Sequence, residues 1–192
     1  MANVSFYPDE ELQQLGLASV GRGVELSRKA TLHGAARISL GDHARIDDFC
    51  VLSAGEGGIA IGRRVHLAVF CSLIGQGRIE LGDYAGLSSR VTIYSSNDDY
   101  SGECMSNPTV PGEFTRVEIA PVRLGRHVIV GAGSVILPGC TLHEGSGVGS
   151  MSLIRSDCEA FGMYFGSPAR RIGWRSARMV ELGDRLEAQE RS

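Results

Sequence analysis

The stretch VGAGSVILPGCTLHEGSGVGSMSLI, residues 130–154, repeats an aliphatic residue at every sixth position. The repeated residues are Val130, Ile136, Leu142, Val148 and Ile154. A period of six is neither the 3.6-residue period of an α-helix nor the two-residue period of a β-strand. It is expected of a solenoid in which three short strands, joined by tight turns, complete a coil of about eighteen residues. The stretch therefore predicts an all-β solenoid.

The same repeat runs through most of the chain. Earlier aliphatic residues at this spacing, many of them followed by glycine, are Val20, Leu26, Leu32, Ile38, Leu40, Ile46, Leu52, Ile61, Leu67, Leu73, Leu81, Leu87, Ile93 and Leu124. A second series of mostly small residues follows four positions later and includes Cys50, Cys71, Val91, Ser134 and Ser152. We predict that the aliphatic residues point into a prism and stack on their copies in adjacent coils, about 4.8 Å away.

The composition of the 192 residues fits one folded, soluble domain and disfavours several classes of function. The chain has 26 glycines and a net charge of −3, without a run of basic residues longer than two, so we do not expect it to bind nucleic acid. No apolar run approaches the ~20 residues that a membrane span needs. The five cysteines form no C-x-x-C pair and follow no signal peptide, which predicts a cytoplasmic location.

The repeat divides the chain into three parts. Residues 1–19 are predicted to form an N-terminal helical cap, because SFYPDEELQQLG has a proline at the helix start, acids in the first turn and a glycine as a stop. Residues 20–172 are predicted to form the solenoid. Residues 173–192 carry apolar residues at helical spacing among charges, which predicts a C-terminal helix. This helix would cover the last coil, pack on a neighbouring subunit or remain solvated.

The repeat breaks most strongly at residues 94–123, YSSNDDYSGECMSNPTVPGEFTRVEIAPVR. The segment is polar, contains three prolines and leaves the prism as a loop. Loops of this length inside compact domains are usually functional. The alternative is a passive insertion that helps subunits to pack.

The order of LGRHVIVGAGSVILPGCTL, VGSMSLI and GSPARRI, together with the repeat, resembles the hexapeptide-repeat acyltransferases. The resemblance covers residues 20–170. It implies a left-handed parallel β-helix, against the usual right-handed preference of crossover connections. It also implies a homotrimer in which each ejected loop reaches an adjacent subunit, with acetyl-CoA as acyl donor in the groove beside the late coils and no metal.

The same resemblance assigns residues to coenzyme A. They are Gly131, Ala132, Gly149, Ser150, Pro168, Arg170 and Arg171. The turn amides of the first four would bond the pantetheine amides, because small residues leave the backbone accessible. The two arginines would meet the phosphates, and the proline would give the adenine a flat apolar contact. The alternatives are glycines that only turn corners and a solvated pair of arginines.

The acceptor is inferred from a missing histidine. Family members that acetylate sugar hydroxyls place a histidine in the ejected loop, whereas this chain has SSNDDYSG there and no histidine between His66 and His127. A hydroxyl needs a well-placed base, but a neutral amine is already nucleophilic, so the amine is favoured. FYPDEELQQLG, RIDDFCVLSAG, VHLAVFCSLIG and SSRVTIYSSNDDYSG also resemble the bacterial N-acetyltransferases of dTDP-linked aminodideoxy sugars, which supply lipopolysaccharide O-antigen units.

Six residues are candidates for the acceptor site. His66 is the candidate catalytic base that takes the ammonium proton, against the alternatives of an ordinary turn histidine and of proton loss through water. The candidate ligands of the sugar or the ammonium are Asp47, Asp48, Asp98, Asp99 and Tyr94. The alternative is turn capping for Asp47 and Asp48, and a solvated Asx turn for Asp98 and Asp99. For Tyr94 the alternative is simple packing.

Three other functions were weighed. The main alternative is an O-acetyltransferase of a sugar or polysaccharide hydroxyl. γ-type carbonic anhydrases share the prism and bind zinc through three histidines, but the histidines here do not form the i, i+5 pair of such a site. A purely structural solenoid would leave the ejected loop and the GSPARR end unexplained.

Overall fold

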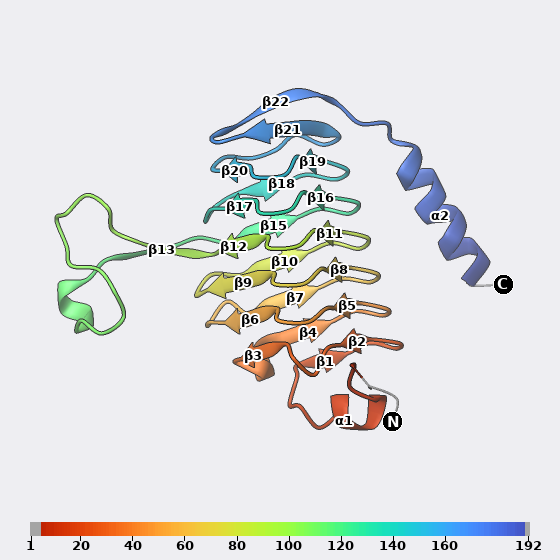
Figure 1. The fold of residues 1–192 in the computed structure, drawn as a ribbon, viewed down its shortest axis with the longest axis horizontal. Helices are drawn as coiled ribbons and strands as arrows, with labels where there is room; N and C mark the ends of the chain where they lie inside the picture. The colour runs from red at the N-terminus through yellow and green to blue at the C-terminus, as the bar shows by residue number, and fades with distance from the viewer. Residues whose placement is uncertain (1–4, 191–192) are drawn as a thin grey trace.

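The computed structural model describes residues 5–190 and shows a parallel β-solenoid with a helix near each end and one long loop (Figure 1). Residues 1–4 of the predicted N-terminal cap and residues 191–192 of the predicted C-terminal helix lie outside the described residues. Three parallel sheets run along the solenoid, and every full coil contributes one strand to each of them. The predicted all-β solenoid is therefore confirmed.

The strands of the three sheets follow one another around the prism. The first sheet consists of β1 (Ser19–Val20), β4 (Ile38–Leu40), β7 (Ile59–Ile61), β10 (Ile79–Leu81), β15 (Val122–Leu124) and β18 (Thr141–Leu142). The second consists of β2 (Glu25–Leu26), β5 (Arg45–Ile46), β8 (His66–Leu67), β11 (Gly86–Leu87), β16 (Ile129–Val130), β19 (Gly147–Val148), β21 (Gly162–Gly166) and β22 (Ala169–Trp174). The third consists of β3 (Thr31–His33), β6 (Val51–Ala54), β9 (Ser72–Gly75), β12 (Thr92–Tyr94), β17 (Val135–Ile136) and β20 (Leu153–Ile154).

The aliphatic residues of the repeat point into the prism. In the first sheet Leu40, Ile61, Leu81, Leu124 and Leu142 are register partners in successive strands. Each of these side chains is at most 3% exposed. Burial of one aliphatic side chain of this size contributes about 1.5–3 kcal/mol, so such stacks hold the coils together. The predicted stacking of the repeat is confirmed.

The small residues of the second series form the corner between the second and third sheets. Ser134 Oγ accepts a hydrogen bond from the Ser152 N–H at 3.1 Å and donates one to the Gly149 carbonyl at 3.0 Å. Ser152 Oγ donates to the same carbonyl at 2.8 Å and accepts from the Gly166 N–H at 3.1 Å. These buried hydroxyls therefore tie the two last coils and the following strand into one rigid corner.

Both ends of the prism are covered. The helix α1 (Asp9–Leu12) places Leu12, which is 1% exposed, over the first coil. At the other end β21 pairs with β19 in parallel, and β22 folds back antiparallel to β21. Since the hairpin lies on the last coil, that coil needs no cover from the C-terminal helix.

The long loop leaves the prism at the end of β12 and returns at β15. Its base is an antiparallel pair formed by β13 (Ser96–Asp98) and β14 (Val117–Ile119), and its tip contains a short 3₁₀ helix, Gly112–Phe114. A second 3₁₀ helix, Ala35–Arg37, precedes β4. Figure 1 shows the loop projecting from the solenoid on the side opposite to the C-terminal helix.

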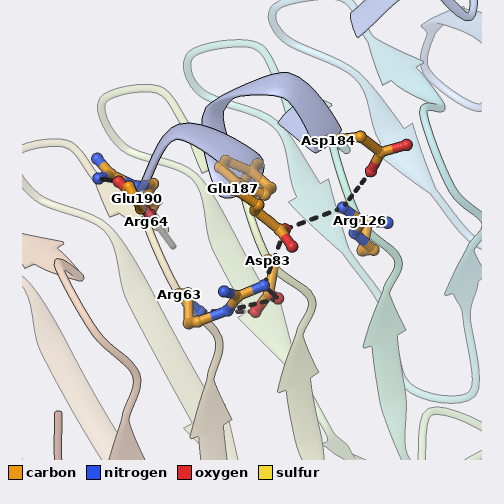
Figure 2. A network of polar contacts seen from close by, with 8 residues as sticks. Arg63, Arg64, Asp83, Arg126, Asp184, Glu187 and Glu190 are labelled. Atoms are coloured by element: carbon orange, nitrogen blue, oxygen red, sulfur yellow. Dashed lines mark hydrogen bonds and ion pairs between the residues drawn. The ribbon is translucent and has the colours of Figure 1, made fainter. Parts of the chain in front are cut away.

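The C-terminal helix α2 (Arg178–Glu190) lies along the outside of the solenoid. Its acidic face contacts arginines that come from the corners of different coils (Figure 2). Glu187 accepts hydrogen bonds from Arg63 at 2.9 Å and from Arg126 at 3.3 Å. The helix is therefore clamped to the corner between the first and second sheets by ion pairs.

A glycine in α2 allows the helix to approach this corner closely. A Cβ atom at Gly183 would lie 2.8 Å from Cε1 and 3.0 Å from Nε2 of the His127 ring. That ring is 8% exposed and stacks on Tyr84, with ring centroids 4.8 Å apart. Burial, and secondarily the charge of Arg126, lowers the pKa of His127, because both disfavour the protonated ring.

We expect Gly183→Ala to loosen α2, although alanine normally stabilises a helix by about 1 kcal/mol relative to glycine. The added methyl group would collide with His127, so the ring should become exposed and its pKa should rise toward the ordinary value of about 6.5. The folded state holds this ring neutral and the unfolded state binds the proton more readily, so docking of α2 weakens as the pH falls below about 6.5. An NMR titration of the histidines measures the shift.

Leu182→Ala is the matched control for this experiment, because Leu182 is 51% exposed on the same helix. It should leave the titration of His127 unchanged. An unaltered His127 pKa in Gly183→Ala would show that close docking of α2 does not bury the ring.

Candidate active site

The outer face of the second sheet carries a row of residues that each precede an inward aliphatic residue. Arg45, His66, Gly86 and Ile129 are register partners in β5, β8, β11 and β16. Strand side chains alternate between the two faces, so these residues point out of the prism while their successors fill it. The candidate base His66 therefore lies in the middle of an exposed sheet face.

Asp47 orients His66. The Oδ2 atom of Asp47 lies 2.9 Å from Nε2 of His66, and its Oδ1 atom accepts a hydrogen bond from Nε of Arg45 at 2.8 Å. Partial burial alone would raise the pKa of Asp47, but the hydrogen bonds from His66 and Arg45 outweigh it and lower that pKa. The ionised carboxylate can only accept, so His66 donates from Nε2 and keeps the lone pair of Nδ1 free. This tautomer is the one that a general base requires.

A depression of about 300 Å³ adjoins the free side of His66. Its lining residues are His66, Ala68, Gly86, Leu87, Ser88, Ser89 and Ile129. The small residues make the floor, and Ser88 adds a hydroxyl to the lining. Gly86, Ser88 and Ile129 are not among the site residues predicted from the sequence. The signal was present, because each stands next to a residue of the six-residue repeat and therefore has a defined face.

The corner after the second sheet presents a row of backbone N–H groups. Among the described residues, the N–H groups of Ala132 and Ser150 have no hydrogen-bond partner, and they lie at the same corner position in adjacent coils. A Cβ atom at Gly131 would lie 2.4 Å from the Ser150 nitrogen, and one at Gly149 would lie 2.4 Å from the Phe165 ring. The two glycines are therefore required by packing, and the two unpaired donors are available to an amide-bearing ligand.

The hairpin between β21 and β22 lies next to this corner. The Gly149 N–H donates to the Tyr164 carbonyl at 2.8 Å, which brings the turn that contains Pro168 close to the unpaired donors. Arg170 is exposed, and within the described part of the chain its guanidinium donates a hydrogen bond only to the Ala169 carbonyl, whereas the guanidinium of Arg171 lies over the Trp174 ring at 4.2 Å. Arg170 is thus the more available cation for a phosphate.

The remaining aspartates occupy different places. Asp48 accepts hydrogen bonds from Ser27 Oγ at 2.5 Å and Lys29 Nζ at 2.7 Å, so its carboxylate ties two coils together. In the loop, Asp99 accepts from the N–H and Oγ of Ser101 and pairs with Arg116, which fixes the loop's own turn. The hydrogen bonds, and to a smaller extent the nearby positive charges, lower the pKa of the carboxyl groups of Asp48 and Asp99.

Asp98 differs from its neighbour, because its carboxylate has no partner among the described residues. Asp98 and Tyr94 line a groove of about 800 Å³ between the loop and the third sheet. The groove that contains Asp98 and the depression beside His66 have no lining residue in common, and Figure 1 shows the loop projecting away from β8. One chain therefore does not bring the two candidate residues together.

Two further classes of site were searched for in residues 5–190. No group of three or more histidine, cysteine, aspartate or glutamate side chains has the arrangement of a metal site there. Within the same residues, no helix has both the length and the apolar character that crossing a bilayer demands.

The chain is similar to characterised acyltransferases over nearly its whole length, although no family model matches it. It is 51% identical over 177 residues to a dTDP-4-amino-4,6-dideoxy-D-glucose acyltransferase of Escherichia coli, which covers 92% of both chains. Its structure matches AntD, an N-acyltransferase from Bacillus cereus solved with dTDP and 3-hydroxybutyryl-CoA, with a TM-score of 0.94 and 39% identity over 98% of this chain and 99% of that one.

A serine-to-cysteine variant of AntD, solved with dTDP-4-amino-4,6-dideoxyglucose and coenzyme A, matches with a TM-score of 0.93 and 38% identity, over 96% of this chain and 98% of that one. These relatives share the parallel β-helix that the repeat predicted, with the left-handed coiling that the resemblance implied. At this identity and coverage, the chain is a member of the dTDP-4-amino-4,6-dideoxyglucose acyltransferase family, enzymes that use acyl-coenzyme A as the donor.

Proposed function

We propose that the protein transfers an acyl group, acetyl in the first instance, from coenzyme A to the 4-amino group of dTDP-4-amino-4,6-dideoxyglucose. The single observation that supports this most directly is the depression beside His66. The unpaired backbone N–H groups of Ala132 and Ser150 form a row along the corner of the late coils, and this row runs toward the depression. Successive coils are about 4.8 Å apart, so an extended pantetheine arm would follow this row to the depression.

The reaction at this site is a simple group transfer. His66 Nδ1 takes the proton of the sugar ammonium, and the neutral amine attacks the thioester carbonyl carbon. The tetrahedral intermediate breaks its C–S bond, and the amine's second proton passes to the leaving thiolate. The products are an amide and free coenzyme A. The Ser88 hydroxyl lines the same depression as His66 and would donate a hydrogen bond to the developing oxyanion.

The site is completed by a second copy of the chain, in a homotrimer. Asp98 has a free carboxylate on a loop that projects away from its own depression, so it reaches the depression of a neighbour and holds the ammonium there. Tyr94 lies in the same groove and contacts the sugar nucleotide. Sedimentation analysis checks the trimer, which is the closed assembly that a heterologous contact of this kind can form.

The acyl donor and the sugar nucleotide support a cytoplasmic reaction, and we propose that the acylated sugar supplies a surface polysaccharide such as O-antigen. All five cysteines are unpaired, and four of them are buried, which fits a reducing compartment.

Thiol release from acetyl-CoA tests the proposal, with the aminosugar nucleotide and its 4-hydroxy analogue compared as acceptors. We expect turnover with the amine only. Equal or faster turnover with the hydroxyl analogue would instead establish the O-acetyltransferase alternative.

A further inference from the structure

Nothing in the structure of the single chain explains why residue 86 is a glycine. It lies in β11, in the middle of the second sheet, where glycine weakens a strand. Its φ is not in the positive range, so any L-residue fits the backbone there. An added Cβ atom would meet nothing within 4 Å. Within one chain, therefore, neither the backbone conformation nor packing requires a residue without a side chain at position 86.

Gly147, two strands further along the same row, shows the contrast. A Cβ atom there would lie 2.8 Å from Cδ of Arg175, whose guanidinium binds three backbone carbonyls of the adjacent coils. Packing therefore accounts for Gly147. A strand glycine that packing does not account for often marks a place where a ligand or another backbone approaches closely, and the depression beside His66 favours a ligand here.

Gly86 forms the floor of the candidate active site, and the space above it is the depression beside His66. Its register partners His66 and Ile129 form opposite walls, and the strands that carry them are about 10 Å apart, which is twice the strand spacing. One wall is an imidazole held by Asp47, and the other is an aliphatic side chain that is 48% exposed. A ligand between them needs an apolar part and a reacting centre near His66.

We propose that the acyl group of the donor occupies this space, and that the bare floor at Gly86 sets the largest acyl group that the protein transfers. This inference rests on the proposed acyl transfer. The corner donors of Ala132 and Ser150 belong to the same later coils as Ile129, so the thioester arrives from the Ile129 side. The acyl chain then continues past the reacting carbon over Gly86, while the amine stays at the Ser88 edge.

Side chains of graded size at Gly86 test the inference. The donors are acetyl-CoA, butyryl-CoA and 3-hydroxybutyryl-CoA, and the acceptor is the aminosugar nucleotide. Wild type should use all three. Gly86→Val should lower kcat/KM for the four-carbon donors by at least about tenfold relative to acetyl-CoA, since one misplaced methylene group in a pocket is worth 10–200-fold. Gly86→Ala should be intermediate and should not lower the Tm, because a strand alanine is favourable there.

Ala60→Val is the matched control, because Ala60 lies at an outward position of the first sheet, away from the depression. It should leave donor selectivity unchanged. An equal loss for all donors with a raised KM for the aminosugar would overturn the inference and place the acceptor above Gly86. Unchanged selectivity in Gly86→Val, or a wild type restricted to acetyl-CoA, would also overturn it. A wild type that turns over no donor would instead refute the proposed function.

Discussion

Replacing His66 by alanine is expected to lower kcat by about 10²–10⁴, the usual contribution of a positioned general base. The carboxylate of Asp47 holds Nε2 of His66 as a donor, so in the proposed reaction Nδ1 would take the ammonium proton. Because the imidazole is half exposed and fills no core space, the fold should survive the change. Steady-state kinetics at saturating aminosugar and acyl-CoA measure the effect, and thermal melting confirms folding.

His33→Ala is the matched control for His66→Ala, since His33 is an exposed strand histidine in the first coil. It should leave kcat within about twofold of wild type. A decrease of less than tenfold in folded His66→Ala would remove His66 from the role of base. The ammonium proton would then leave through water.

Asp98→Asn should lower kcat/KM for the aminosugar by about 10²-fold, because loss of one partner from a desolvated charge pair typically costs 2–5 kcal/mol. The carboxylate has no partner among residues 5–190, and in the proposed reaction it would be buried against the ammonium of the substrate. The loss should be largest for the amine acceptor. Glu113→Gln changes another exposed acid of the same loop and should have no such effect.

A mixture of the two inactive variants tests whether Asp98 acts on a neighbouring subunit. If His66 and Asp98 come from different chains, random trimers of His66→Ala and Asp98→Asn should recover about one quarter of wild-type activity, since one interface in four pairs an intact His66 with an intact Asp98. If both residues serve the same chain's site, no mixture should recover activity.

The sequence predicted the core almost residue by residue. A strict six-residue repeat fixes which side chains point into the prism and which of them stack on one another, as the register of Leu40, Ile61 and Leu81 shows. It also predicted the ejected loop, because the six-residue repeat stops at residue 94 and resumes after residue 123. The position of α2 was not predictable in this way. Its partners Arg63 and Arg126 come from different coils, and only the fold brings them to one corner.

The candidate site was only partly predictable for a similar reason. Asp47 and His66 were given separate roles, yet they form one hydrogen-bonded pair across adjacent strands. Their contact depends on the register of β5 on β8, which pairs Arg45 with His66 and brings the next outward side chain, Asp47, beside the imidazole. Asp48 and Asp98 carry the same charge and stand next to similar residues, but only the structure shows that the first is paired and the second is free.

The most direct measurement is the identity of the product made from acyl-CoA and dTDP-4-amino-4,6-dideoxyglucose. Mass spectrometry, followed by treatment with hydroxylamine, separates an amide from an ester. The account predicts one acyl group on the 4-amino nitrogen, stable to hydroxylamine. A hydroxylamine-labile product with the amine still free would contradict it.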